Sequence, residues 1–182
     1  MASQLHHELR EVMRESLRRA ATAESSVGSG LSICFDESDP DRMCAPDAFL
    51  RLGVPQGWIT TWKTWEQGAP ELCIEILSPS EPVEKAELER SLVCFRIMGV
   101  REVIAFDTSA PVGGRLRAWD LASGELVPRT IENERTPCRT LDLWFVIAPC
   151  AHPVLDHALR LAQTASGDGL VPTPVEAIRA ES

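Results

Sequence analysis

The fold is decided by residues 70–107, which read PELCIEILSPSEPVEKAELERSLVCFRIMGVREVIAFD. The first part, ELCIEIL at 71–77, is short and almost wholly apolar, which is typical of a buried central strand. A helix is predicted from Val83 to Met98, because its apolar residues recur on one helical face and Gly99 follows it as a C-terminal glycine. REVIAFD at 101–107 predicts a second buried strand. The stretch therefore predicts a strand–helix–strand unit with a right-handed crossover.

The segments on either side complete a mixed α/β fold. Apolar residues at intervals of three and four predict an N-terminal helix, and two runs separated by Ala-Ser-Gly predict an antiparallel hairpin at the sheet edge. We expect one domain over residues 1–165 and a loosely packed tail over 166–182. The further predicted elements are a helix at 5–22, a loop at 23–30, strands at 31–36 and 46–52, the hairpin at 115–131, a strand at 143–147 and a helix from Val154 to Ala162.

Composition limits the classes of function. The chain has 182 residues, is 44% hydrophobic and carries a formal net charge of -9. Such a charge argues against nonspecific coating of nucleic acid, which depends on Lys and Arg neutralising phosphates, although a small local basic groove remains compatible with it. The sequence has neither a run of about 18 apolar residues nor the apolar stretch of a secretory signal near its start, so we expect a cytoplasmic protein without a membrane span.

The six cysteines are scattered, without a CxxC pair or any zinc-type spacing. Cys34 and Cys73 lie inside apolar runs, where a free cysteine behaves as a small buried hydrophobe. We therefore expect core positions for such cysteines, no thiolate metal site and, in a reducing cytoplasm, no disulfides.

Three tryptophans are concentrated between two predicted strands. Trp58, Trp62 and Trp65 are spaced as one short helical face or a lid would be, and equally as a satellite hydrophobic cluster under a long loop. We favour the satellite cluster.

Three arginines, Arg10, Arg14 and Arg18, form a stripe along the first predicted helix, with glutamates between them. The stripe is typical of a solvated helix face, and phosphate contact is the alternative. We favour the solvated face.

Glu75 stands at the centre of an apolar strand, where a buried carboxylate without a partner would cost several kcal/mol. Asp47 follows Pro46 at the head of another predicted strand and would face the same point if the two strands pair. Two converging carboxylates suit a hard divalent cation such as Mg²⁺. A salt bridge to arginine would also compensate Glu75, and the residues alone leave both arrangements open.

Three segments resemble the bacterial Uma-two type family of restriction endonucleases, a branch of the PD-(D/E)XK nuclease superfamily. They are CAPDAFLRL at 44–52, PELCIEILSPSEP at 70–82 and FRIMGVREVIAFD at 95–107, in the family's order and spacing. EILSPS is the most specific part, and the resemblance covers roughly residues 5–150. His6 is similar to the histidine that opens the family's N-terminal core helix. Family members usually carry a further acidic residue before that helix, and the printed sequence shows no counterpart to it.

The resemblance implies a restriction-endonuclease-like mixed sheet flanked by helices and metal-assisted hydrolysis of DNA. Asp47 and Glu75 would be the catalytic acids and would hold Mg²⁺ or Mn²⁺ together with the carbonyl of Ile76. The superfamily's usual lysine position is Leu77 here. The family instead takes its lysine from the following helix, at the position of Ser91.

The missing lysine leaves two functions open. One is a slow or conditional Mg²⁺-dependent endonuclease, and the other is a catalytically inactive binding or interaction module on the same fold. Lys85 lies about 120° around the helix from Ser91 and points elsewhere, and Arg90 is a poor proton acceptor. Family members are often dimeric, which makes a homodimer through the hairpin at 115–131 an expectation of the resemblance.

Overall fold

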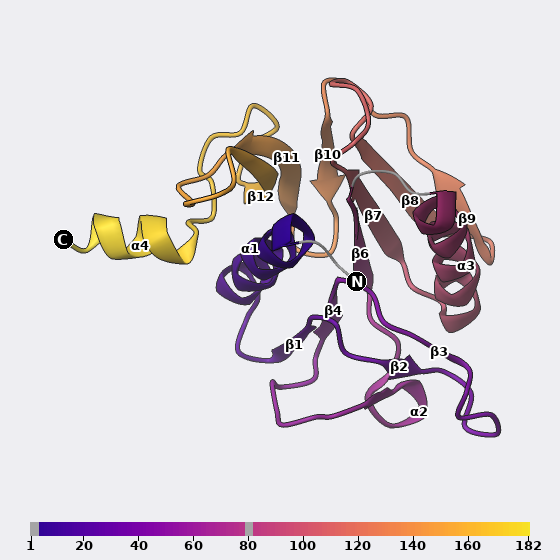
Figure 1. The fold of residues 1–182 in the computed structure, drawn as a ribbon. Coiled ribbons are helices and arrows are strands. Elements are labelled where there is room, and N and C mark those ends of the chain that lie inside the picture. The colour runs from indigo at the N-terminus through magenta and orange to yellow at the C-terminus, as the bar shows by residue number, and fades with distance from the viewer. Residues whose placement is uncertain (1–3, 79–81) are drawn as a thin grey trace.

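The computed structural model describes residues 4–78 and 82–182, and it has a mixed α/β fold in which a six-stranded sheet is covered on both faces (Figure 1). Pro79 and Ser80 of the EILSPS segment lie outside the described residues. The elements are α1 (Gln4–Ala20), β1 (Ser25–Gly28), β2 (Ile33–Cys34), β3 (Met43–Cys44), β4 (Ala48–Leu52), β5 (Trp62–Lys63), α2 (Thr64–Gln67), β6 (Leu72–Leu77), α3 (Pro82–Met98), β7 (Glu102–Asp107), β8 (Leu116–Ala122), β9 (Glu125–Pro128), β10 (Arg135–Cys138), β11 (Leu143–Pro149), β12 (His157–Ala162) and α4 (Pro174–Ala180).

The central sheet is mixed, with the strand order β1-β4-β6-β7-β8-β9. Strands β6 and β7 run parallel and are joined by α3, whereas the other neighbouring pairs are antiparallel. Gly99 directly follows α3 with φ +81, the left-handed conformation that glycine adopts easily at a helix C-terminus. The mixed α/β class and the strand–helix–strand unit predicted from residues 70–107 are confirmed.

Alternate residues of each central strand face two different cores. Ile74 and Ile76 of β6 belong to the core shared with α1 and the three-stranded sheet β10-β11-β12. Cys73 and Leu77 belong to the core beneath α3, which also contains Trp62 of β5. Glu75 therefore points to the α3 face of the sheet.

The predicted edge hairpin is present. Strands β8 and β9 pair from Trp119↔Pro128 to Ala122↔Glu125, and Ser123 and Gly124 form the two-residue turn with φ 51 and 78. Positive φ at both turn residues matches the twist of the flanking strands, and glycine tolerates it well. β9 is the outermost strand of the six.

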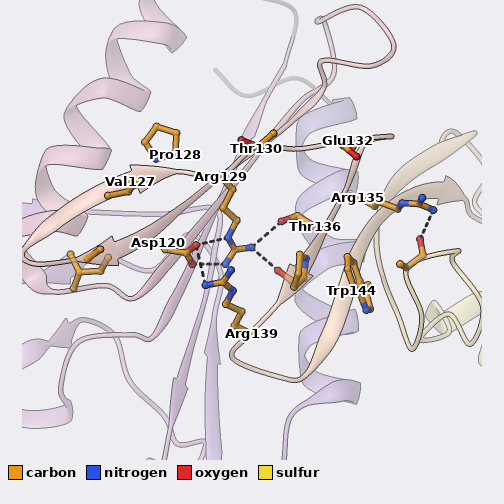
Figure 2. Close-up of a pocket in the computed structure, with 14 residues that line it drawn as sticks. Asp120, Val127, Pro128, Arg129, Thr130, Glu132, Arg135, Thr136, Arg139 and Trp144 are labelled. Carbon is orange, nitrogen blue, oxygen red and sulfur yellow. Dashed lines mark hydrogen bonds and ion pairs between the residues drawn. The ribbon is translucent and has the colours of Figure 1, made fainter.

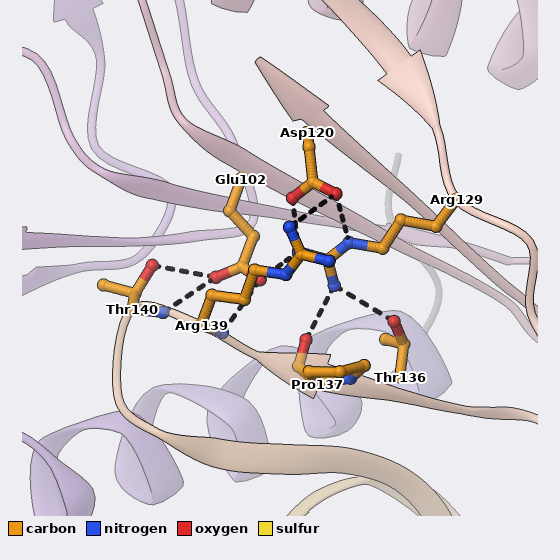
Figure 3. A network of polar contacts seen from close by, with 7 residues as sticks. All are labelled: Glu102, Asp120, Arg129, Thr136, Pro137, Arg139 and Thr140. Atoms are coloured by element: carbon orange, nitrogen blue, oxygen red, sulfur yellow. Dashed lines mark hydrogen bonds and ion pairs between the residues drawn. The ribbon is translucent and has the colours of Figure 1, made fainter. Parts of the chain in front are cut away.

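A buried polar network joins this hairpin to β7 and β10 (Figure 3). The Arg129 guanidinium donates hydrogen bonds to the carboxylates of Glu102 and Asp120, and also to the Thr136 hydroxyl at 3.0 Å and the Pro137 carbonyl at 2.6 Å. The side chains of Arg129 and Glu102 are 6% and 3% exposed. Charges this deeply buried are tolerated because nearly every donor and acceptor in the network is satisfied.

Two predictions about secondary structure were wrong. The segment from Val154 to Ala162 is not a helix: its last six residues form β12, which pairs with β11 from Trp144↔Ala162 to Pro149↔His157. The segment 23–30 is not simply a loop, because it contains β1, which pairs with β4. Gly28 of β1 lies against the Phe49 ring, where an added Cβ would come within 2.2 Å of a ring carbon.

The tryptophans have three different environments. Trp62 is 2% exposed, packs edge-on to Phe49 with ring centroids 5.1 Å apart, and donates from Nε1 to the Gly68 carbonyl at 2.8 Å. Trp65 is 39% exposed and Trp58 97%. The predicted satellite cluster is wrong, because Trp62 belongs to the core beneath α3 and the other two tryptophans are exposed.

The C-terminal segment ends in α4, which projects away from the sheets (Figure 1). Thr173 and Glu176 form a reciprocal capping box at its start. Glu176 also accepts a 2.7 Å hydrogen bond from Arg160 of β12, whose side chain is 1% exposed. No residue of α4 is buried, so this ion pair and its hydrogen bonds hold the helix rather than an apolar core. No helix in the described part of the chain is long and apolar enough to cross a membrane.

Candidate active site

The register of two strands brings Asp47 and Glu75 together. β4 pairs antiparallel with β6, with Ala48 opposite Ile74. One step further along this register Asp47 stands opposite Glu75, and directly opposed residues on one face of an antiparallel pair have Cβ atoms about 5 Å apart. The charge of Asp47 acts directly on the Glu75 carboxyl. The convergence predicted from the sequence is therefore present in the structure.

The Asp47 carboxylate is held from two sides and is 8% exposed. One oxygen lies 2.7 Å from Nε2 of His6 on α1, and the other accepts the backbone N–H of Ile76 at 2.7 Å. The Ser29 hydroxyl donates to the Asp47 carbonyl at 3.0 Å, which fixes the backbone as well. Asp47 therefore has one well-defined orientation at the head of β4.

Burial raises the pKa of the partly buried Glu75 carboxyl well above its usual range, and the charge of Asp47 acts in the same direction. A hydrogen bond from the Ser91 hydroxyl lowers this pKa, and the nearby Glu87 raises it. The Glu75 carboxyl therefore holds its proton more tightly than an exposed glutamate does.

The raised pKa of Glu75 predicts how the stability of the protein depends on pH. Because the folded protein holds the Glu75 proton more tightly than the unfolded chain, stability falls as pH rises from the ordinary carboxyl pKa towards the raised one. Glutamine keeps a donor for Asp47 without a titrating proton. We expect Glu75→Gln, in metal-free buffer, to gain stability over wild type as pH rises from 5 to 9, by at most about 1.4 kcal/mol per pH unit. Urea unfolding at a series of pH values measures this.

Glu134→Gln is the matched control, because its stability relative to wild type should change with pH in the opposite direction. Hydrogen bonds from Arg115 lower the pKa of Glu134 to about 2. The ionised Glu134 stabilises the folded protein above the unfolded pKa, and this contribution is lost as pH falls. The loss of stability in Glu134→Gln should therefore become smaller towards acid pH. Parallel curves for wild type and Glu75→Gln from pH 5 to 9 would contradict the raised pKa of Glu75.

The donor set fits a hard divalent cation. The Leu77 carbonyl accepts from Thr108 of the β7 segment, so the carbonyl of Ile76, one residue earlier, lies on the opposite edge of β6, where its own N–H meets Asp47. Two carboxyls and this carbonyl would supply oxygen ligands on one side. Among the described residues no group of three or more His, Cys, Asp or Glu side chains is suited to hold a metal. Water and substrate would therefore complete the coordination, as is usual for Mg²⁺.

The position from which the family takes its lysine lies at the acid pair. Ser91 of α3 lies beside the Glu75 carboxyl, and its hydroxyl lowers the pKa of that group. Lys85 and Arg90 are exposed, form no ion pair with another described residue, and are not among the groups that shift the pKa of Glu75. Neither replaces a lysine at position 91.

Another cavity, of about 880 Å³, lies between the edge hairpin and strands β10 and β11 (Figure 2). Three arginines line it, but each is engaged: Arg129 in the buried network, Arg139 in an ion pair with Asp120, and Arg135 in a hydrogen bond to the Ala165 carbonyl. Asp120, which lines this cavity, lies on one face of the central sheet and Glu75 lies on the other. The acid pair is therefore the candidate active site.

Sequence reasoning missed the contacts from α1. It identified His6 only by resemblance and favoured a solvated face for the arginine stripe. In the structure both His6 and Arg10 approach Asp47, with Arg10 Nη1 4.0 Å from the same carboxylate oxygen as His6. The signal available was their spacing, because residues four apart share one face of a helix.

Comparisons with known proteins found similarity among solved structures only. No family model and no curated protein matches the chain. Among solved structures, one is described as "a putative nuclease belonging to DUF820 from Anabaena variabilis ATCC 29413". It is 14% identical, the match covers 78% of this chain and 75% of that chain, and the TM-score is 0.49.

Proposed function

We propose that this protein is an endonuclease that hydrolyses phosphodiester bonds of DNA with Mg²⁺ or Mn²⁺. The ligands would be Asp47, Glu75 and the carbonyl of Ile76. One observation carries the proposal: the strand register sets the Asp47 and Glu75 carboxyls opposite each other, where burial and the charge of Asp47 raise the pKa of Glu75. A divalent ion satisfies such a pair better than a proton does, since it neutralises both charges. The resemblance of the Pro-Asp and EILSPS segments to the restriction endonuclease family supports the same chemistry.

Each residue of the site would have a different role in the reaction. A bound divalent ion would polarise the scissile phosphate and lower the pKa of an attacking water. Glu75 would have to give up its proton to solvent before its carboxylate could hold the ion. Asp47 is already oriented by the Ile76 N–H and His6, so little ordering is needed. The hydroxyl of Ser91 carries no charge with which to stabilise the developing negative charge, so we expect slow turnover.

The same serine favours a second candidate, a catalytically inactive nuclease-fold module that binds DNA or another partner. A neutral side chain in contact with Glu75 leaves the acid pair without the positive charge that the resemblance implies. For both candidates we also propose a homodimer that forms through β9, because β9 is an edge strand of the six-stranded sheet.

Metal binding and cleavage test the proposal together. Calorimetry with Mn²⁺ should detect binding to wild type, and Asp47→Asn and Glu75→Gln should weaken it by about tenfold or more, which is at least 1.4 kcal/mol. Supercoiled plasmid should be cut by wild type with Mn²⁺ and not with a chelator, and both acid variants should be inactive. The matched control is Glu132→Gln, an exposed acid that lines the other cavity.

The outcomes separate the candidates. Metal binding that depends on both acids, with DNA binding and no cleavage, would identify the inactive module. Mn²⁺ binding that survives both substitutions would refute the metal site.

A further inference from the structure

The arginine stripe of α1 divides into two environments. Arg14 donates to Glu11 at 3.1 Å and pairs with Glu15 at 3.3 Å, and Arg18 lies 4.0 Å from Glu15. These two arginines are neutralised along their own helix. Arg10 instead points at the candidate active site, where Nη1 is 4.0 Å from Oδ1 of Asp47.

Two features of the fold fix the position of Arg10. It lies one helical turn beyond His6, on the side of α1 that faces Asp47. Its guanidinium also lies against Gly30, where an added Cβ would be 3.1 Å from Nη1, and Gly30 has φ +63. The Gly30 N–H donates to the Pro46 carbonyl, immediately before Asp47. Arg10 is therefore held between the glycine loop and the head of β4.

The Arg10 guanidinium keeps its hydrogen-bonding capacity. A separation of 4.0 Å from Asp47 is an ion pair and too long for a hydrogen bond. Among the described residues no side-chain hydrogen bond of Arg10 is formed, although a guanidinium has five N–H donors. The side chain is 27% exposed, so part of it meets solvent beside the acid pair.

We infer that Arg10 binds a phosphate oxygen of the DNA backbone next to the acid pair, an inference that rests on the proposed function. A chain with net charge -9 needs localised cations to hold a polyanion, and arginine presents a planar fork that matches phosphate. The charge of Asp47 holds Arg10 nearby while the acid pair is free of metal.

The salt dependence of DNA binding tests this inference. The probe is a fluorescent duplex of about 20 base pairs in buffer with a chelator, with affinity measured by anisotropy over a range of salt concentrations. Each phosphate contact contributes about 0.9 to the slope of log K against log salt. We expect Arg10→Met to reduce the slope by about 0.9, Arg10→Lys to retain most of it, and Arg14→Met, the matched control on the same helix, to leave it unchanged.

The outcomes distinguish two failures. An unchanged slope in Arg10→Met, with wild type binding DNA, overturns the role of Arg10 and leaves the proposed function standing. Absence of DNA binding by wild type at low salt, with chelator or with Ca²⁺, overturns the proposed function and this inference with it. A role limited to neutralising Asp47 would appear as tighter Mn²⁺ binding by Arg10→Met with an unchanged slope, and it also overturns the inference. Thermal unfolding of each variant verifies that it is folded.

Discussion

Replacing Ser91 by lysine is expected to raise the rate of plasmid cleavage by about 100- to 1000-fold over wild type, the effect of one well-placed charge stabiliser. The Ser91 side chain reaches Glu75 from α3, so a longer side chain from the same position would enter the acid pair itself. Ser91 is only half-buried, which leaves room for the lysine stem towards solvent. The ammonium group would stabilise the negative charge that develops on the phosphate. It would also favour the ionised form of Glu75, the form that binds metal.

Initial rates with supercoiled plasmid and saturating Mn²⁺ measure this effect. Val93→Lys is the matched control, because it adds the same charge at an exposed position of the same helix, where the valine is 49% exposed. Ser91→Met adds bulk without charge and should give no gain. Glu75→Gln combined with Ser91→Lys should abolish the gain. Equal rates for Ser91→Lys and Val93→Lys would show that general attraction of DNA, and not the position of the charge, limits the reaction.

The part of the fold that local patterns determine could be predicted from the sequence. β6 and β7 are buried apolar runs, α3 has a one-sided apolar pattern and a terminal glycine, and the β8–β9 hairpin has its turn in Ser123 and Gly124. The acid pair was predictable for a related reason. A glutamate inside a buried strand requires a partner, and Asp47 heads the strand that pairs with it.

The remainder depends on contacts between distant segments. β1 is formed by Ser-Ser-Val-Gly, which has no apolar alternation, and it becomes a strand because β4 offers it an edge and Gly28 admits the Phe49 ring. The segment that forms β12 has apolar residues at helical intervals, and its pairing with β11 overrides them. The buried Arg160 within it pairs with Glu176, 16 positions further along the chain, which no local pattern reveals.

Removing Arg129 is expected to cost about 3 to 5 kcal/mol of the free energy of unfolding, because it leaves a buried charge without its partner. Arg129→Met would fill much of the same space. Glu102, which is 2% exposed, would keep the N–H groups of Arg139 and Thr140 and the Thr140 hydroxyl but would lose its only cation among the described residues. Asp120 would retain only the exposed Arg139. Urea unfolding followed by circular dichroism measures the loss.

The matched control is Arg139→Met, which removes an arginine from the same Asp120. The Arg139 side chain is 64% exposed and its nitrogen lies 3.3 Å from the carboxylate. Such surface pairs contribute about 0.2 to 1 kcal/mol, so this variant should be nearly as stable as wild type. Adding Glu102→Gln to Arg129→Met removes the stranded charge and should recover part of the loss, so that the two substitutions are not additive. A cost below about 1 kcal/mol for Arg129→Met would show that water reaches Glu102 and replaces the arginine. The network would then not be what joins the edge hairpin to the centre of the sheet.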